Sequence, residues 1–128
     1  MGLASRRHAK GLGWAATSIA VCTTLAACSG ETPRGVGDAE HGAQLVGREA
    51  CGSCHLIPGR ADGIGMVGPP LGGMARRTVI AGFLPNRPDE MVRWLQAPQS
   101  ILPRSTMPDM GLTRRQAADI AAYLYTLE

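Results

Sequence analysis

The stretch Cys51-Gly52-Ser53-Cys54-His55 decides how the rest of this 128-residue chain is interpreted. Two cysteines stand with two residues between them, and a histidine follows the second cysteine directly. On one turn of helix this spacing brings both thiols to one side, with the imidazole just beyond them. Three side chains that can form covalent or coordinate bonds are therefore grouped on a single turn.

This motif indicates covalent attachment of a haem group, because Cys-x-x-Cys-His is the attachment sequence of haem c. The thiols of Cys51 and Cys54 each add to a vinyl group of the porphyrin and form a thioether. His55 then binds the iron as the proximal ligand. We expect one haem c, held by two thioether bonds, with its iron on His55.

Three other kinds of site also use closely spaced cysteines. A structural zinc site needs four ligands, and His41 is the only further histidine outside the N-terminal segment. A thioredoxin-like pair belongs between a strand and a helix, and no strand pattern precedes Cys51. A disulfide between Cys51 and Cys54 would close a tight, strained loop. The haem interpretation is therefore favoured.

The composition is sparse for a core built from protein alone. The chain has one Phe, two Tyr and two Trp, but 17 Gly and nine Pro. Residues 58–82 are rich in glycine and proline and show no helix or strand period. A long segment without regular structure is uncommon in a compact domain. It makes sense if the chain wraps a large rigid group.

Helices are expected on both sides of this segment. The first begins near Asp38, a good N-cap, and runs to about Ala50. Gly42 inside it marks either a close helix crossing or a poor helix. A second helix begins at Asn86–Glu90, with proline in its first turn, and Pro98 stops it.

The last helix has the clearest pattern. Thr113 and Gln116 form a capping box, and apolar residues follow at helical spacing. This apolar stripe consists of Ala117, Ile120, Ala121, Leu124 and Leu127. The segment Gln99–Gly111 before it is expected to be irregular. The sequence therefore predicts an all-α domain of about three to four helices.

The N-terminal segment is typical of an export signal. Arg6, Arg7 and Lys10 precede an apolar run from Leu12 to Ala27. This run is short and weak for a spanning helix, which needs about 20 strongly apolar residues. The three cations also account for the net charge of +3, since no acidic residue precedes Cys28. No basic stripe with interleaved aromatic residues follows, so no nucleic acid partner is expected.

The end of the apolar run, Leu25-Ala26-Ala27-Cys28, resembles a bacterial lipobox. In such lipoproteins the signal is cut before the cysteine, and lipid is attached to the cysteine sulfur. An ordinary signal with an incidental Cys28 and an uncleaved anchor are the alternatives. We expect residues 1–27 to be a lipoprotein-type signal, 28–37 a flexible tether and 38–128 the folded domain. It would lie on the periplasmic side of a bacterial membrane, anchored by lipid on Cys28.

A second iron ligand is expected from a methionine, because a thioether sulfur is a common partner of histidine in electron-transfer haems. The competing role for any methionine is to fill a gap in the core. The candidates are Met66, Met74, Met91, Met107 and Met110. Met91 lies in an expected helix, and composition does not decide between Met107 and Met110.

From Asp38 to its end, the chain resembles the class I cytochrome c family. That family has a helix, the haem motif, a Gly-Pro-x-Leu loop, a middle helix, a methionine loop and a terminal helix. Here Gly68-Pro69-Pro70-Leu71 and Met107-Pro108 stand in the corresponding places. The resemblance implies a cytochrome c fold around one haem, with Met107 as the distal ligand and Met110 as a packing residue.

Two further roles follow from the resemblance alone. The Pro69 carbonyl is expected to accept a hydrogen bond from His55 Nδ1, which makes the imidazole a better donor to iron. The terminal helix is expected to cross the first helix at Gly42.

Trp94-Leu95 followed by Pro98-Gln99 resembles bacterial cytochromes that are linked to terminal oxidases. In such relatives a tryptophan donates its indole N–H to a haem propionate, and a purely structural Trp94 is the alternative. Arg76 or Arg77 is either a propionate partner or a solvated surface arginine. The lysines that ring the haem edge in mitochondrial relatives are absent here.

The resemblance implies a membrane-tethered electron carrier and not an enzyme. Its expected partners are a quinol–cytochrome c oxidoreductase as donor and a terminal oxidase as acceptor. One alternative is a fixed haem c subunit of a larger redox complex. Another is a haem enzyme with an open iron site, for which His41 is the only spare histidine.

Overall fold

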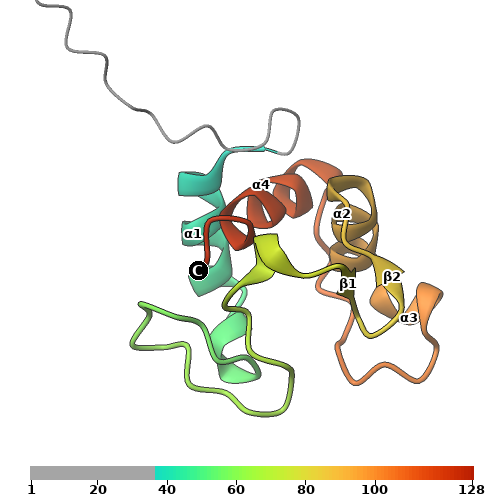
Figure 1. Ribbon diagram of the computed structural model, residues 1–128, viewed down its shortest axis with the longest axis horizontal. Coiled ribbons are helices and arrows are strands. Elements are labelled where there is room, and N and C mark those ends of the chain that lie inside the picture. The colour runs from blue at the N-terminus through green and yellow to red at the C-terminus, as the bar shows by residue number, and fades with distance from the viewer. Residues whose placement is uncertain (1–36) are drawn as a thin grey trace, which may run out of the picture.

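A computed structural model describes residues 37–128, and its regular structure is mainly helical (Figure 1). The helices are α1 (Ala39–Arg48), α2 (Pro88–Gln96), α3 (Pro98–Ile101) and α4 (Arg114–Leu124). Two short 3-10 turns, η1 (Cys51–Ser53) and η2 (Met74–Arg76), and two short strands, β1 (Val79–Ile80) and β2 (Leu84–Pro85), complete the elements. The predicted all-α class is confirmed. The expected signal, Cys28 and all of the tether except Gly37 lie outside the described residues.

Helix α1 begins as predicted, at the side chain of Asp38. Its carboxylate accepts hydrogen bonds from the backbone N–H groups of Glu40 and His41, at 2.9 and 3.1 Å. Helix α4 then lies across α1 (Figure 1). A Cβ atom on Gly42 would lie 1.9 Å from the backbone oxygen of Asp119 in α4. Gly42 therefore marks a close crossing, and the alternative of a poor helix is wrong.

A buried carboxylate fixes this crossing. Asp119 accepts a hydrogen bond from the backbone N–H of Asp38 and contacts His41 Nδ1, both at 2.8 Å. Burial acts to raise the pKa of Asp119, but these two partners outweigh burial and lower the pKa below its ordinary value. Asp119 is therefore ionised at neutral pH and ties the beginning of α1 to the middle of α4.

The C-terminal helix α4 follows its sequence pattern closely. The Thr113 hydroxyl and the Gln116 side chain form the predicted capping box. Every residue of the predicted apolar stripe is buried, and α4 packs against both α1 and α2. This helix is consequently the centre of the protein part of the core.

One segment differs from its prediction. Pro98 ends α2, but it also occupies the first turn of α3, in a stretch predicted to be irregular. Proline is favourable at the first helical position, because its ring fixes φ and its missing N–H has no helical partner there. A helix of one turn leaves no periodicity in the sequence, so the pattern could not reveal it.

The strands β1 and β2 were likewise absent from the sequence prediction. They form a two-residue antiparallel ladder that pairs Val79 with Pro85 and Ile80 with Leu84. An alternating pattern cannot develop over two residues, so the sequence shows none. Among the helices of residues 37–128, none is long and apolar enough to cross a membrane.

Candidate haem-binding site

The Cys-x-x-Cys-His motif lies on a tight turn directly after α1. Ala50 adopts a left-handed conformation with φ of 52° and starts the turn η1. The backbone N–H groups of Cys54 and His55 both donate to the Cys51 carbonyl, at 3.2 and 3.0 Å. Both cysteines are free thiols, and burial raises the pKa of the Cys51 thiol above its ordinary value. The motif is therefore folded into one compact turn.

Two apolar cavities open beside this turn. The larger, of about 300 Å³, is lined by Cys51, His55, Pro69, Trp94 and Met107, together with buried aliphatic residues of α1, α2 and α4. The smaller, of about 120 Å³, is lined by Cys54 as well, and shares Cys51, His55 and Met107 with the larger one. The fold thus brings all six predicted site residues to the walls of two cavities that share three of these residues.

The imidazole of His55 is held in a defined tautomer. Its Nδ1 lies 2.7 Å from the Pro69 carbonyl oxygen, as the resemblance implies. Because a carbonyl can only accept, Nδ1 carries the proton and donates it. In the neutral imidazole, Nε2 then has the free lone pair through which histidine binds a metal.

Three glycines allow the loop after the motif to pass close to it, and sequence reasoning assigned none of them this role. A Cβ on Gly68 would lie 2.3 Å from Cε1 of the His55 ring. A Cβ on Gly52 would lie 2.2 Å from the Asp62 oxygen, and one on Gly65 would lie 2.4 Å from the Cys54 backbone. The density of glycine after Pro58 was the only signal of this close wrapping.

The methionines differ in their position relative to the cavities. Met107 lines both of them, together with Cys51 and His55. Met110 lines only the smaller cavity, whereas Met74 and Met91 are buried in the wall of the larger one. Met66 is 91% exposed. Of the five candidates, Met107 is therefore the one that best fits a distal ligand.

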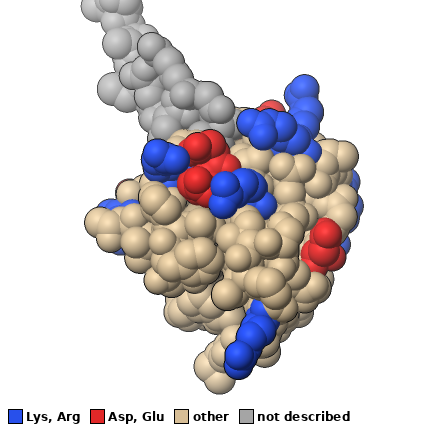
Figure 2. Space-filling view, turned by 90° about the vertical axis from the view of Figure 1, so that its right-hand side faces the viewer, with Lys and Arg blue, Asp and Glu red and all other residues tan. Residues whose placement is uncertain are grey.

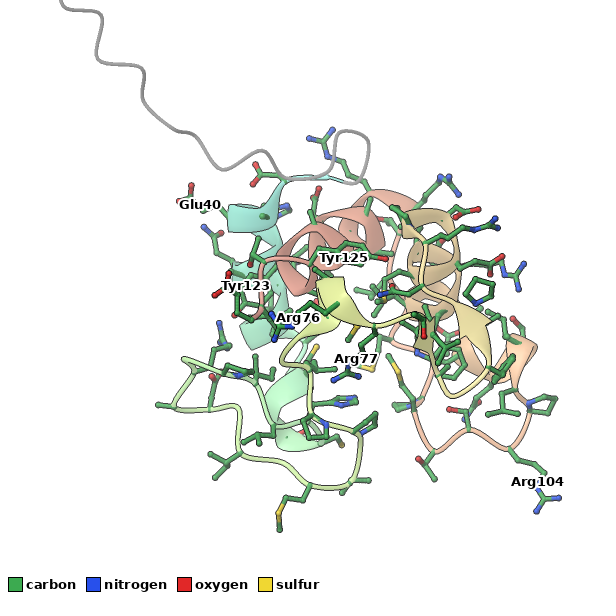
Figure 3. The ribbon with its side chains drawn as sticks, viewed as in Figure 1. Glu40, Arg76, Arg77, Arg104, Tyr123 and Tyr125 are labelled. Carbon is green, nitrogen blue, oxygen red and sulfur yellow. The ribbon has the colours of Figure 1, made fainter. Side chains whose placement is uncertain are left out.

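Polar groups on the cavity wall are few. Among residues 37–128, Arg77 is the only arginine, lysine or carboxylate on the wall of the larger cavity. Figure 3 shows its side chain in the space between the motif loop and the segment that follows α3. Arg76 is exposed and lines neither cavity, so of the two candidates Arg77 fits a propionate partner. Trp94 lines the larger cavity and is half-buried.

This set of side chains fits a haem. Two free thiols, an imidazole with an available Nε2, a thioether and one cation surround an apolar space, which is what a covalently attached porphyrin requires. Within the described part of the chain, no group of three or more His, Cys, Asp or Glu side chains could hold a metal ion. Residues 37–128 therefore give no support to the interpretation of the motif as a zinc site.

Comparison with known proteins gives consistent results. Residues 39–128 match the family model described as Cytochrome c. The chain is 33% identical to cytochrome c-552 of Bradyrhizobium diazoefficiens over 108 residues, which cover 84% of this chain and 91% of that protein. It is 31% identical to cytochrome c oxidase subunit 2 of Alkalihalophilus pseudofirmus over 93 residues, 70% of this chain. In that case the match spans only 26% of the relative.

Proposed function

Since the chain belongs to the cytochrome c family and is a haem c electron carrier, we propose that it works as a carrier tethered to a membrane. It would take single electrons from a quinol–cytochrome c oxidoreductase and deliver them to a terminal oxidase. The main support for this proposal is the turn that holds Cys51, Cys54 and His55 beside an apolar cavity, with Met107 on the wall of the same cavity.

Different residues of this chain have different roles in the proposed electron transfer. When bound, haem c supplies an iron centre that gains and loses one electron. Cys51 and Cys54 would fix the group covalently, while His55 and Met107 would ligate the iron in both oxidation states. The aliphatic wall excludes water, and Trp94 and Arg77 offer N–H donors to the propionates.

An uncharged, apolar surface near the motif supports docking to a partner protein. Ile64, Met66 and Val67 are 74%, 91% and 72% exposed, and residues 63–75 contain no charged side chain. Figure 2 shows that broad areas of one face of the molecule likewise carry no charge. Apolar contacts would then hold the partner, and electron transfer should depend only weakly on salt, because few surface charges are there to be screened.

The tether rests on the lipobox-like sequence before Cys28. Lipid on Cys28 would keep the carrier beside its partners and raise their effective concentration. Replacement of Cys28 by serine should release the haem protein from membranes into the soluble fraction. Continued tight membrane association of that variant would contradict the lipid anchor.

Optical spectra of the purified protein test the haem and its ligands together. We expect covalently bound haem, low-spin iron in both oxidation states, and a methionine–iron charge-transfer absorption in the oxidised protein. Met107→Ala should abolish that absorption, whereas Met110→Ala should leave it in place. The reverse result would reassign the ligand, and zinc without covalent haem would overturn the proposal.

A second candidate function is that of a fixed haem c subunit in one larger complex. It is favoured by the similarity to a segment of a protein named cytochrome c oxidase subunit 2. Co-purification with an oxidase at a constant ratio would support this role, and recovery of the free protein from membranes would support the carrier. A haem enzyme has less support, because His41 contacts Asp119 and lines neither cavity.

A further inference from the structure

The carbonyl groups of Pro69 and Pro70 both depend on side chains for hydrogen bonds. Neither proline has a backbone N–H, and each carbonyl points to a side-chain donor. His55 Nδ1 donates to the Pro69 carbonyl at 2.7 Å. Nη2 of Arg77 donates to the carbonyls of Pro70 and of Gly72, the latter at 2.9 Å. Arg77 therefore secures the segment that presents the Pro69 oxygen to His55.

Asn86, between β2 and α2, secures the residue that carries this guanidinium. Its Nδ2 donates to the carbonyls of Met74 and Arg77, at 2.7 and 2.9 Å. Its Oδ1 accepts from the Tyr125 hydroxyl at 2.8 Å. Because both backbone partners can only accept, the amide has one possible orientation. Both the Nδ2 amino group and the Oδ1 atom of Asn86 are therefore hydrogen-bonded.

The third member of this network is Tyr125, which directly follows α4. Burial raises the pKa of Tyr125, so its hydroxyl stays protonated and donates at neutral pH. In Figure 3, Tyr125 reaches from the end of α4 toward the centre of the molecule, above Arg77. The best-packed helix of the fold is in this way connected, through Asn86, to the segment that adjoins His55.

We propose that Asn86 is a positioning residue for His55. By holding residues 74–77 against the end of α4, it keeps the Arg77 guanidinium on the carbonyls of Pro70 and Gly72. The Pro69 carbonyl is thereby kept on the imidazole. This inference rests on the proposed function in one respect, namely that His55 is a haem ligand.

The expected consequence is an effect of Asn86 on the reduction potential. A hydrogen bond from Nδ1 to a carbonyl increases the electron donation of the imidazole to iron. Stronger donation stabilises the ferric state more than the ferrous state and lowers the potential. Loss of Asn86 should loosen the Pro69 carbonyl, weaken this hydrogen bond and raise the potential, although no residue on the cavity wall has changed.

The test compares Asn86→Ala and Tyr125→Phe with Thr113→Ala in the full-length haem protein. Thr113→Ala removes the cap at the other end of α4 and serves as a control for loss of stability alone. The readouts are solvent exchange of the His55 Nδ1 proton by NMR, the midpoint potential and thermal unfolding. Asn86→Ala should accelerate exchange roughly tenfold, as expected for loss of about one hydrogen bond, and raise the potential.

Tyr125→Phe keeps the Asn86 amide and should change both readouts in the same direction by a smaller factor. Thr113→Ala should lower only the unfolding temperature. If the Asn86 and Tyr125 variants unfold earlier but keep wild-type exchange and potential, Asn86 is only structural and the inference is wrong. If Asn86→Ala does not fold, Tyr125→Phe decides alone. Absence of covalent haem in the unmodified protein would instead contradict the proposed function.

Discussion

The two sides of the larger cavity are held together in different ways. On the side of His55, hydrogen bonds join segments that are distant in the chain. The Pro69 carbonyl accepts from His55, and the backbone N–H groups of Gly68 and Leu71 donate to residues 54 and 56, both at 2.8 Å. On the side of Met107, the contacts are local. Its N–H donates to the Ser105 hydroxyl at 3.1 Å.

The contrast extends along the whole distal segment. Among the described residues, no hydrogen bond of residues 103–111 reaches more than six positions along the chain. Local hydrogen bonds can break without unfolding the rest of a domain, and such segments open at low free energy. The chain itself therefore fixes the proximal geometry, whereas the distal geometry would depend on the proposed bond between Met107 and iron.

The largest expected effect comes from removing either of the two proposed iron ligands, His55 or Met107. His55→Ala should abolish the stable low-spin haem protein, because the proximal geometry is built around that imidazole. Met107→Ala should retain covalently bound haem and lose only the distal ligand. Haem staining of denatured protein and the optical spectrum measure both results. Equal losses in the two variants would remove the proposed difference between the two sides.

Adding a single methyl group on each side gives the next largest effect. In Gly68→Ala, the new Cβ would lie 2.3 Å from the His55 ring, and such overpacking costs about 3 kcal/mol. In Gly111→Ala, nothing lies within 4 Å, but φ of 64° is strained for alanine, at about 1 kcal/mol. Denaturant unfolding of both variants checks the order. A larger loss for Gly111→Ala would contradict it.

A smaller effect tests the crossing of α1 and α4, from which the proximal turn extends. The lowered pKa of Asp119 in the folded state means that its contribution is present above the unfolded pKa, about 3.9. It is lost as the pH falls through the folded pKa. Asp119→Asn should therefore cost about 1–2 kcal/mol at pH 7, and the difference from wild type should shrink below pH 4.

Thermal unfolding as a function of pH measures this difference. Glu40→Gln is the control, because Glu40 is an exposed carboxylate on α1, the other helix of this crossing, and should change stability by less than about 0.5 kcal/mol. A cost of Asp119→Asn that stays constant from pH 7 to pH 3 would show that ionisation of Asp119 contributes nothing.

The smallest effect concerns a longer-range hydrogen bond next to the distal segment, between Gln96 and Leu112. Gln96 Nε2 donates to the Leu112 carbonyl at 3.5 Å, a long and weak hydrogen bond. Gln96→Ala should change the free energy of unfolding by about 0.5 kcal/mol or less. It should nevertheless speed the replacement of Met107 by added imidazole. The loss of the charge-transfer absorption over time measures this rate. Unchanged replacement kinetics would show that this contact does not restrain the distal side.

The features that could be predicted from the sequence are those with a local cause. Asp38 and Thr113 cap their helices through residues two or three positions away, and the haem motif lies on one turn. The close contact at Gly42 was open between two interpretations until Asp119 was seen against it. The role of Asn86 gave no signal beyond that of a helix start, because its three partners lie 9, 12 and 39 positions away from it along the chain. The glycine-rich loop predicted wrapping, but it did not show that Gly68 adjoins the imidazole.

The local bonding of residues 103–111 also bears on the order in which the protein is assembled. A porphyrin is a broad rigid plate, and it can enter only while one wall of its site is displaced. The distal segment can move aside without breaking a long-range hydrogen bond, while the turn with Cys51, Cys54 and His55 stays formed. Thioether formation would then come first, with closure of the distal wall by Met107 as the last step of maturation.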